Sequence, residues 1–306
     1  MKAATRVTLA LGDGTPVNPA YRVLQHSIGE ALEGISASPP ITDEAIHDAR
    51  KALKKARAAL RLLRDGMSKT VYRRQNAGLR DAGRFLSPFR DARSLIDAFD
   101  ALHERYADPL QGFDLVPLQK LLHANLVKAR RHFSHTPAEQ ENCIRLLREC
   151  IALLKEKDVA SIDFDAIDTG LRHIYRKGCR ARAEARATQT PETLHEWRKQ
   201  VKYLLNAVES LHPLAKGATA KTLKWADHLA DSLGDDHDLV MLSRETARGV
   251  YAPVDADLIK ALDALIDRRR AKLQKRAFGL GRKLYGKKPG QFAKSIPPYL
   301  APSVHP

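Results

Sequence analysis

One thirteen-residue pattern occurs twice in this chain, and it limits what the chain can fold into more than any other feature. The two copies are residues 42–54 (TDEAIHDARKALK) and residues 190–202 (TPETLHEWRKQVK). The positions that are identical in both copies are Thr42/Thr190, Glu44/Glu192, His47/His195, Arg50/Arg198, Lys51/Lys199 and Lys54/Lys202. A repeat separated by about half of the 306 residues indicates a duplicated architecture. Because the repeat keeps His, Arg and Lys as well as apolar spacing, we expect the two halves to share a site as well as a fold.

Local signals predict an all-α chain. Segments rich in Ala, Leu, Arg and Lys favour helix, Pro and Gly interrupt them, and no alternating strand pattern stands out. Each copy of the repeat starts a helix, with Thr42 or Thr190 at the N-cap position. The predicted helices cover residues 15–36, 42–67, 69–86, 90–106, 115–134, 138–157, 164–188, 191–211, 218–233, 236–249 and 255–285. We divide the chain into a first helical half, residues 1–157, a second helical half, residues 158–290, and an irregular tail, residues 291–306.

The first copy begins a line of positive side chains that continues along one helix face. Spacings of alternately three and four residues separate its members, which are His47, Arg50, Lys54, Arg57, Arg61 and Arg64. That spacing keeps the side chains on one face, about 100° around the helix from an apolar stripe between Leu53 and Leu63. The second copy starts the same line at His195, but Leu205 and Glu209 interrupt it. We therefore expect the first half to supply more of the positive charge.

A basic stripe on a single helix is most simply a solvated surface. Such surfaces mix charges of both signs, whereas residues 50–64 contain no acid. A solvated surface also has little physical reason to keep Arg and Lys in matching register in two halves of a chain. We therefore interpret the two copies as parts of a binding site.

The net charge favours a polyanionic partner. The chain has 52 Lys and Arg against 36 Asp and Glu, a formal net charge of +16 at pH 7. Such an excess attracts polyanions, and the candidates are nucleic acid, an anionic membrane surface and phosphate polymers. Aromatic residues make up only 6% of the chain, which weakens the case for stacking on single-stranded bases. A helical nucleic-acid-binding protein is the alternative hypothesis.

Cysteine usage and hydropathy indicate a cytoplasmic protein. Cys143, Cys150 and Cys179 form no disulfide framework and no zinc pattern. The N-terminal stretch has only a short apolar run before Gly12, and no later stretch approaches the length of an apolar membrane span. We therefore expect no membrane partner.

The acidic run Asp231, Asp235, Asp236, His237 and Asp238 has two interpretations. It is either a set of metal ligands or a turn at Gly234 followed by acids at the start of the next helix. We favour the turn, because the first half has Ser87, Pro88 and Phe89 at the corresponding positions. We therefore predict no metal and no cofactor. No zinc-protease helix, phosphate-binding loop or nucleophile elbow is present, so we also expect no catalytic residues and no enzymatic activity.

These residues resemble the CHAD (conserved histidine α-helical domain) family. Each copy of the repeat contains H-x-x-R-K-x-[LV]-K after a Thr-capped helix start, which is similar to that family's defining element. The resemblance extends to a family-like L-x-x-x-[RH]-D turn at Leu86 and Arg90–Asp91, with a counterpart at Leu233 and His237–Asp238. It covers residues 15–290, nearly the whole chain.

The resemblance implies two helical bundles related by a pseudo-two-fold axis, with a basic cavity where the His helices meet. It also implies that the ligand is inorganic polyphosphate. Some members of the family are located on intracellular polymer granules, so granule surface proteins are further candidate partners. The ligand-facing residues transferred by matching position are His47, Arg50, Lys51, Lys54, His195, Arg198, Lys199 and Lys202. Arg57 and Arg61 continue the stripe, and Arg22, Arg176 and Arg180 come from the looser Tyr–Arg pattern that precedes each His helix.

The residue types suit a phosphate polymer. Arg offers a planar fork that matches two phosphate oxygens, and Lys offers a compact point charge. A His among such cations should be neutral without ligand and should protonate more easily beside a phosphate. We therefore expect binding to strengthen as the pH falls toward about 6. Whether the histidines contact the ligand or position Arg50 and Arg198 stays open.

Overall fold

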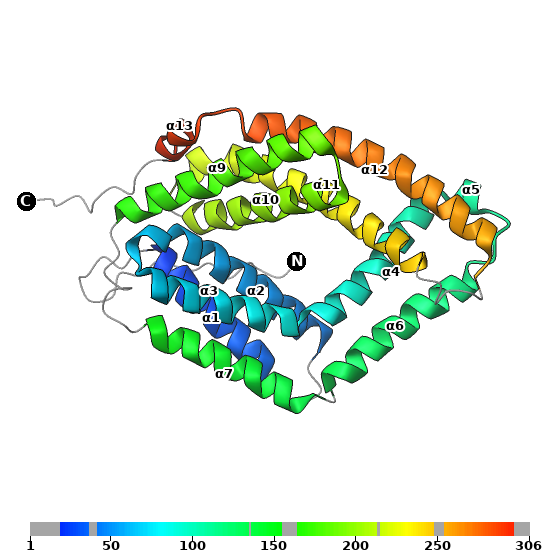
Figure 1. Cartoon of the computed structure of the whole chain (residues 1–306), viewed down its shortest axis with the longest axis horizontal. Helices are drawn as coiled ribbons and strands as arrows, with labels where there is room; N and C mark the ends of the chain where they lie inside the picture. Colours follow the sequence, from blue (N-terminus) through cyan, green and yellow to red (C-terminus); the bar gives the residue numbers. More distant parts are fainter. Residues whose placement is uncertain are drawn as a thin grey trace, which may run out of the picture.

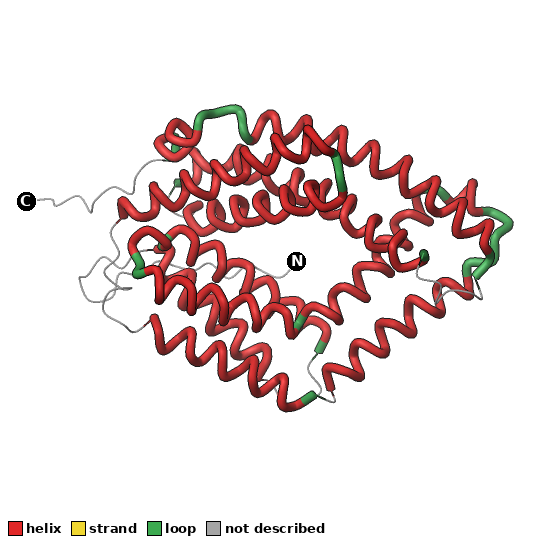
Figure 2. The backbone as a smooth tube through the Cα atoms, viewed as in Figure 1, coloured by secondary structure: helices red, strands yellow, loops and turns green. Residues whose placement is uncertain are grey.

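A computed structural model of the protein describes residues 19–36, 42–134, 136–154, 164–212, 215–247 and 254–296. In these ranges the chain forms helices and the turns that join them, without any strand, so the all-α prediction is confirmed (Figure 2). The elements are α1 (Pro19–Ser36), α2 (Asp43–Leu62), η1 (Arg64–Gly66), α3 (Lys69–Phe85), α4 (Ser87–Arg105), α5 (Ala107–Leu110), α6 (Val116–Ser134), α7 (Pro137–Leu154), α9 (Phe164–Thr188), α10 (Pro191–Leu211), α11 (Lys216–Thr246), α12 (Ala256–Leu284) and α13 (Pro289–Lys294).

Both copies of the repeat start a helix in the predicted way. At the start of α2, Thr42 Oγ1 accepts a hydrogen bond from the backbone N–H of Ala45 over 3.1 Å. At the start of α10, Thr190 Oγ1 accepts one from the backbone N–H of Thr193 over 3.3 Å. Each hydroxyl satisfies a backbone donor that has no partner inside its helix.

The two repeat helices, α2 and α10, pack against each other in the middle of the fold (Figure 1). On one side, α1 and α3 flank α2 and contact α7; on the other, α9 and α11 flank α10, and α12 packs against α11. Their apolar faces form one continuous core, in which Trp197 of α10 is fully buried. The apolar stripe of each repeat helix therefore fixes how the two sets of helices meet.

Two glycines allow helices to approach more closely than any other residue would. A Cβ atom at Gly170 of α9 would lie 2.3 Å from the carbonyl oxygen of Leu62, at the end of α2. A Cβ atom at Gly281 of α12 would lie 2.5 Å from Cζ2 of Trp197. The first of these contacts holds α9 against the end of α2, beside the last residues of the basic stripe.

The predicted helix break at Gly234 is wrong. The sequence predicts helices over residues 218–233 and 236–249, but α11 continues from Lys216 to Thr246. One glycine inside a helix costs only about 1 kcal/mol, and Leu229, Leu233 and Leu239 bury their side chains on both sides of it. In the first half the helix does end, between α3 and α4, because Pro88 has no N–H to continue the helical hydrogen bonds.

The predicted irregular tail begins with a short helix, α13. Its anchor is Tyr175 of α9, whose ring stacks on Phe292 with 4.0 Å between ring centroids. The Tyr175 hydroxyl donates to the carbonyl oxygen of Leu284 over 3.1 Å and accepts from the backbone N–H of Lys287 over 3.2 Å. The predicted helix ends at 15–18 and 155–157, and the rest of the predicted tail from 297 onward, lie outside the described residues.

Gly170→Ala is expected to destabilise the protein by about 1–3 kcal/mol, because the added methyl group overlaps backbone that cannot rotate away. Urea denaturation followed by circular dichroism measures the change. Gly29→Ala in α1 is the matched control: nothing lies within 4 Å of its Cβ position, and it should raise stability by up to about 1 kcal/mol. Equal effects of the two substitutions would contradict the close approach of α9 and α2.

Candidate functional site

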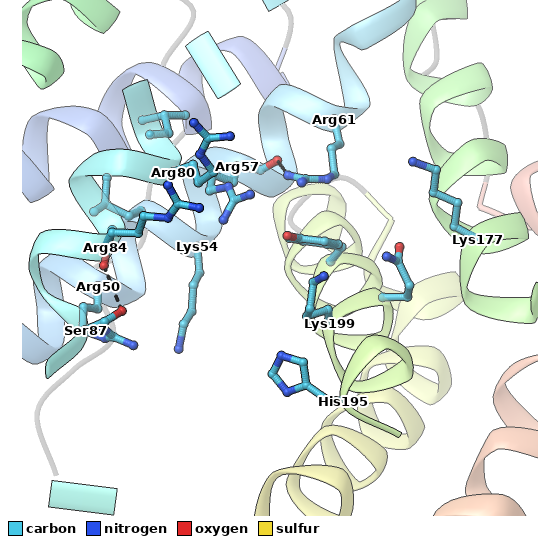
Figure 3. A pocket seen from close by; sticks show the side chains of 15 residues that line it. Arg50, Lys54, Arg57, Arg61, Arg80, Arg84, Ser87, Lys177, His195 and Lys199 are labelled. Carbon is cyan, nitrogen blue, oxygen red and sulfur yellow. Dashed lines mark hydrogen bonds between the residues drawn. The ribbon is translucent and has the colours of Figure 1, made fainter. Parts of the chain in front are cut away.

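A cavity of about 640 Å³ lies between α2 and α3 on one side and α9 and α10 on the other (Figure 3). Its walls contain cations from all four helices and no carboxylate. The lining residues are Arg50, Leu53, Lys54, Arg57, Arg61, Leu79, Arg80, Gly83, Arg84, Ser87, Lys177, His195, Lys199, Gln200 and Tyr203. Helices from both halves of the chain therefore build one basic concavity.

The stripe on α2 supplies the densest part of this lining. Arg50, Lys54, Arg57 and Arg61 all line the cavity, as their spacing along one helix face requires. The opposite face of α2 is buried in the core and consists largely of Ala and Leu. Because that face is buried in the core, the cationic face of α2 is oriented toward the cavity.

Tyr203 of α10 lies against the two arginines at the end of the stripe. The Arg61 guanidinium carbon is 3.7 Å from the centroid of the Tyr203 ring, and that of Arg57 is 5.9 Å away. Arg61 Nη1 also donates to the carbonyl oxygen of Arg57 over 2.7 Å. The negative face of an aromatic ring attracts a guanidinium, so Tyr203 holds Arg61 in place without neutralising its charge.

Polar contacts position three further arginines on the side of the cavity formed by α2 and α3. Arg50 Nη1 donates to Ser87 Oγ over 3.0 Å, at the junction between α3 and α4. On α3, Asp81 accepts hydrogen bonds from Arg80 over 2.9 Å and from Arg84 over 3.2 Å. Asp81 does not line the cavity, so it orients the two arginines from beside the opening.

Burial and crowding lower the pKa values of the lining cations. Partial desolvation, together with the charges of Arg50, Arg198 and Lys202, lowers the pKa of Lys54 to about 8. Desolvation also lowers the pKa of Arg50 and of Arg61. These shifts have the sign expected for positive charges that share a confined space without counter-ions.

His195 pairs with a second histidine. Its Nδ1 atom lies 3.2 Å from Nδ1 of His237 on α11, and the two ring centroids are 4.3 Å apart. Desolvation lowers the pKa of His195, and Arg198 and Lys199 add to the effect. Desolvation, together with His195 and Arg198, lowers the pKa of His237 to about 4. Both rings are therefore neutral at pH 7, and one nitrogen of the pair donates to the other.

The two L-x-x-x-[RH]-D elements place a carboxylate near the Arg of each repeat. Desolvation lowers the pKa of Arg50, and the negative charge of Asp91 partly opposes this shift. In the second half, burial raises the pKa of Asp238, and Arg198 opposes that shift. Arg198 also lies over Gly234, where a Cβ atom would be 3.7 Å from its Nε. The duplicated elements therefore meet in an equivalent way behind the cavity.

The structure brings about half of the predicted site residues together at the cavity. Those that line it are Arg50, Lys54, Arg57, Arg61, His195 and Lys199, and those that do not are His47, Lys51, Arg198, Lys202, Arg22, Arg176 and Arg180. Arg198 and Lys202 are nevertheless close enough to Lys54 to lower its pKa.

The remaining predicted residues lie elsewhere. His47 and Lys51 are exposed on α2, Arg22 is half-buried on α1, and Arg176 and Arg180 are exposed on α9. The two repeat histidines are therefore not equivalent, since His195 lines the cavity and His47 does not. The expected asymmetry is present, because the first half supplies most of the lining cations.

Sequence reasoning missed several lining residues. Arg80 and Arg84 are four residues apart on α3, a spacing that places them on one face, but the neighbouring Asp81 makes them look like a surface ion-pair cluster. Tyr203 stands where the first copy has Lys55, so the sequence shows only the loss of a cation there, and Gln200 gives no signal. Lys177 lines the cavity (Figure 3), whereas the predicted Arg176, one residue earlier and about 100° around α9, does not.

The described part of the chain shows neither a metal centre nor a membrane-spanning helix. No three His, Cys, Asp or Glu side chains there are grouped so that they could hold a metal ion. None of the helices placed by the structure combines the length and the hydropathy needed to cross a membrane.

Comparisons with known proteins agree with the all-α fold. The fold is similar to that of PptA from Streptomyces chartreusis, with a TM-score of 0.60 and 14% sequence identity, over 88% of this chain and 98% of that one. At this identity the likeness shows the fold alone. No curated protein matches the chain. The family model of the CHAD domain matches residues 26–247, which include both repeats and end before α12. Since that match spans most of the sequence, the chain belongs to the CHAD family.

Proposed function

We propose that the protein binds inorganic polyphosphate in the basic cavity and does not act on it as an enzyme. One observation carries the proposal: four cations on one face of α2, with two arginines of α3 beside them, lie across a cavity from cations of α9 and α10, and the lining contains no acid. Like charges at this density are unfavourable unless a polyanion joins them. The CHAD resemblance implies the same ligand.

A polymer fits this site better than a small anion. A single phosphate group would neutralise few of the lining cations, whereas consecutive phosphates of one chain would meet the row of Arg50, Lys54, Arg57 and Arg61 in turn. Binding would release counter-ions from the polymer, so affinity should fall steeply with salt. It would also relieve repulsion in the folded state, so the ligand should raise the melting temperature.

The donors are held in position before any ligand arrives. Ser87 fixes Arg50, Tyr203 lies under Arg61, and Asp81 orients Arg80 and Arg84. Side chains that are already ordered lose less rotamer entropy on binding. Such a site favours tight binding of phosphate oxygens by Arg forks.

The surroundings of His195 favour binding over catalysis. A nucleophilic or general-base histidine is usually oriented by a carboxylate, whereas His195 is hydrogen-bonded to His237.

Within the same proposal the protein attaches to polyphosphate granules in the cytoplasm, where granule surface proteins would be additional partners. Competition between polyphosphate and nucleic acid distinguishes this function from nucleic-acid binding, and an assay for released phosphate tests for hydrolysis.

Lys54→Gln combined with Arg61→Gln is expected to weaken polyphosphate binding at least about tenfold, because two charge-assisted contacts are lost. Titration calorimetry at fixed ionic strength measures the change. The matched control is Lys51→Gln combined with Lys55→Gln, which removes the same charge from the same helix but not from the cavity lining. If both double variants lose affinity equally, net charge and not the cavity is responsible.

Binding is expected to weaken above about pH 8. In the free protein Lys54 loses its proton near its lowered pKa of about 8, whereas a bound polyanion should return the pKa toward its ordinary value of about 10.4. Below pH 8 both states are protonated, so this group adds no pH dependence. Between these two pKa values binding takes up a proton, and the affinity should fall by up to about tenfold per pH unit.

The same titration with Lys54→Gln provides the check. Its affinity should be lower at pH 7 and should change less between pH 8 and 10 than that of the unmodified protein. Lys51→Gln should retain the full dependence on pH. An unchanged slope in Lys54→Gln would show that another group takes up the proton.

Tyr203→Leu is expected to weaken binding by about 1 kcal/mol, or fivefold, because Arg61 loses the ring that holds it. Tyr203→Phe keeps the ring and should bind within about twofold of the unmodified protein. Fluorescence competition measures both affinities, and melting temperatures control for lost packing. Equal losses in the two variants would assign the role to the hydroxyl and not to the ring.

A further inference from the structure

The longest stretch of the chain without an acid is strongly basic and lies outside the cavity. Residues 268–296 contain eleven Lys and Arg and no Asp or Glu. They form the second half of α12, the turn that follows it, and α13. This segment also lies beyond residues 26–247, where the family model matches. A basic cavity therefore does not account for most of the net charge of this chain.

In α12 these cations gather on the side that faces away from the core. Leu273, Ala277 and Leu284 are buried, and with 100° per residue the opposite side of the helix is occupied by the charged residues. We call this surface the C-terminal basic face and define it as Arg268, Lys272, Lys275, Arg282, Lys283, Lys287 and Lys288, all of which are exposed.

Most of these charges are not compensated. None of the five lysines of the C-terminal basic face forms an ion pair with a residue that the structure describes. By contrast, Arg269 pairs with Asp235 over 3.7 Å, and the half-buried Arg270 pairs with the buried Asp236 over 3.2 Å. The inner cations of this helix therefore serve the fold, whereas the outer lysines have no ion-pair partner among the described residues; of the outer arginines, Arg268 lies over the Tyr106 ring, 5.7 Å from its centroid.

The segment is a firm part of the fold. Gly281 packs on Trp197, and the ring of Tyr285 packs on Gly178 of α9 so closely that a Cβ atom there would lie 2.4 Å from the Tyr285 hydroxyl. Tyr175 accepts a hydrogen bond from the backbone of Lys287. The backbone that carries the cations is therefore held in place, which lowers the entropy cost of binding a partner.

Helix α9 connects this face to the cavity. Lys177 lines the cavity, and Tyr175, two residues earlier and about 200° around the helix, faces α13. The exposed Arg180 and Arg176 lie about 60° and 100° from Lys177, on the solvent side between these two positions. Two predicted ligand residues that do not line the cavity are therefore placed where a chain leaving it would pass.

The chemistry of the C-terminal basic face selects among polyanions. Of the aromatic residues of this segment, Tyr285 and Phe292 are buried, and the half-buried Phe278 is stacked on Trp197, so little aromatic surface is left for stacking with bases. The exposed large apolar residues in the described part of the chain are Val116 and Val127, both on α6, so nothing here would insert into a bilayer. The face therefore fits a ligand that consists only of phosphates.

We propose that a long polyphosphate chain, bound in the cavity, continues over Arg180 and Arg176 of α9 onto the C-terminal basic face. This inference rests on the proposed function and adds selectivity for length: short chains occupy the cavity alone, and long chains occupy both surfaces. Joining two surfaces through one chain makes the second contact intramolecular, which commonly raises affinity by a factor of about 100 or more.

The test compares the affinities for chains of about ten phosphates and for chains of about a hundred or more. Chain length should affect the affinity only if one chain can contact both surfaces. The variant replaces four lysines of the C-terminal basic face by Gln: Lys272, Lys275, Lys283 and Lys287. It should bind long chains at least about tenfold more weakly and short chains within about twofold of the unmodified protein. The slope of log affinity against log salt for long chains should fall by about 2 to 3.

A matched control replaces four exposed lysines on α6 and α11 by Gln: Lys120, Lys128, Lys216 and Lys221. It has the same net charge as the test variant and should leave both affinities unchanged. Equal losses in test and control variants would overturn the proposal, as would an unchanged affinity of the test variant for long chains. So would a larger loss for duplex DNA or anionic vesicles than for polyphosphate. Failure of the unmodified protein to bind even short chains would instead refute the cavity itself.

Discussion

The packing of α2 against α10 is the contact on which the rest of the molecule depends. Each helix has an apolar stripe and, beside it, a line of polar and positive residues. When the apolar stripes are buried in one core, the neighbouring lines are brought to the same side. The cavity is therefore a consequence of burying Leu, Ala and Trp side chains, with the cations gathered next to the interface because they share its helices.

Gathering cations in this way lowers the stability of the free protein. The lowered pKa values of Arg50, Lys54 and Arg61 report that cost, and desolvation is the main cause in each case. The structure offsets part of it with neutral or shared contacts: a hydroxyl from Ser87, a ring from Tyr203 and carboxylates just behind the lining. None of these contacts places a carboxylate in the cavity itself, so the opening keeps its positive charge for a ligand.

The two halves diverged around a shared plan. Where the first half has an arginine in the L-x-x-x-[RH]-D element, the second has His237, and this histidine pairs with His195. Where the first half continues its basic stripe with Arg57 and Arg61, the second half has Leu205 and Glu209. The second half instead adds α12 and α13, with a separate basic surface on the outside. Positive charge is therefore distributed between a cavity lined mainly by the first half and the C-terminal basic face, which belongs to the second half.

Much of this organisation is readable in the sequence, because it depends on local spacing. The Thr N-caps, the helix period of the stripe and its acid-free surroundings require only neighbours along the chain, and they led to α2 and to its lining cations. The helix boundary at Gly234 was predicted wrongly for the same reason. A local signal for a turn was outweighed by leucines packing from other helices, which no window of the sequence contains.

The sequence by itself determined that the chain is helical, duplicated and basic, and that positive side chains occupy one face of α2. Only the tertiary structure decided which cations share a space. Arg80, Arg84 and Lys177 join the stripe because α3 and α9 happen to flank it, whereas His47 is left at the surface although it matches His195 in the repeat. Spacing along a chain fixes the direction of a side chain relative to its own helix, but what it faces depends on how the helices pack.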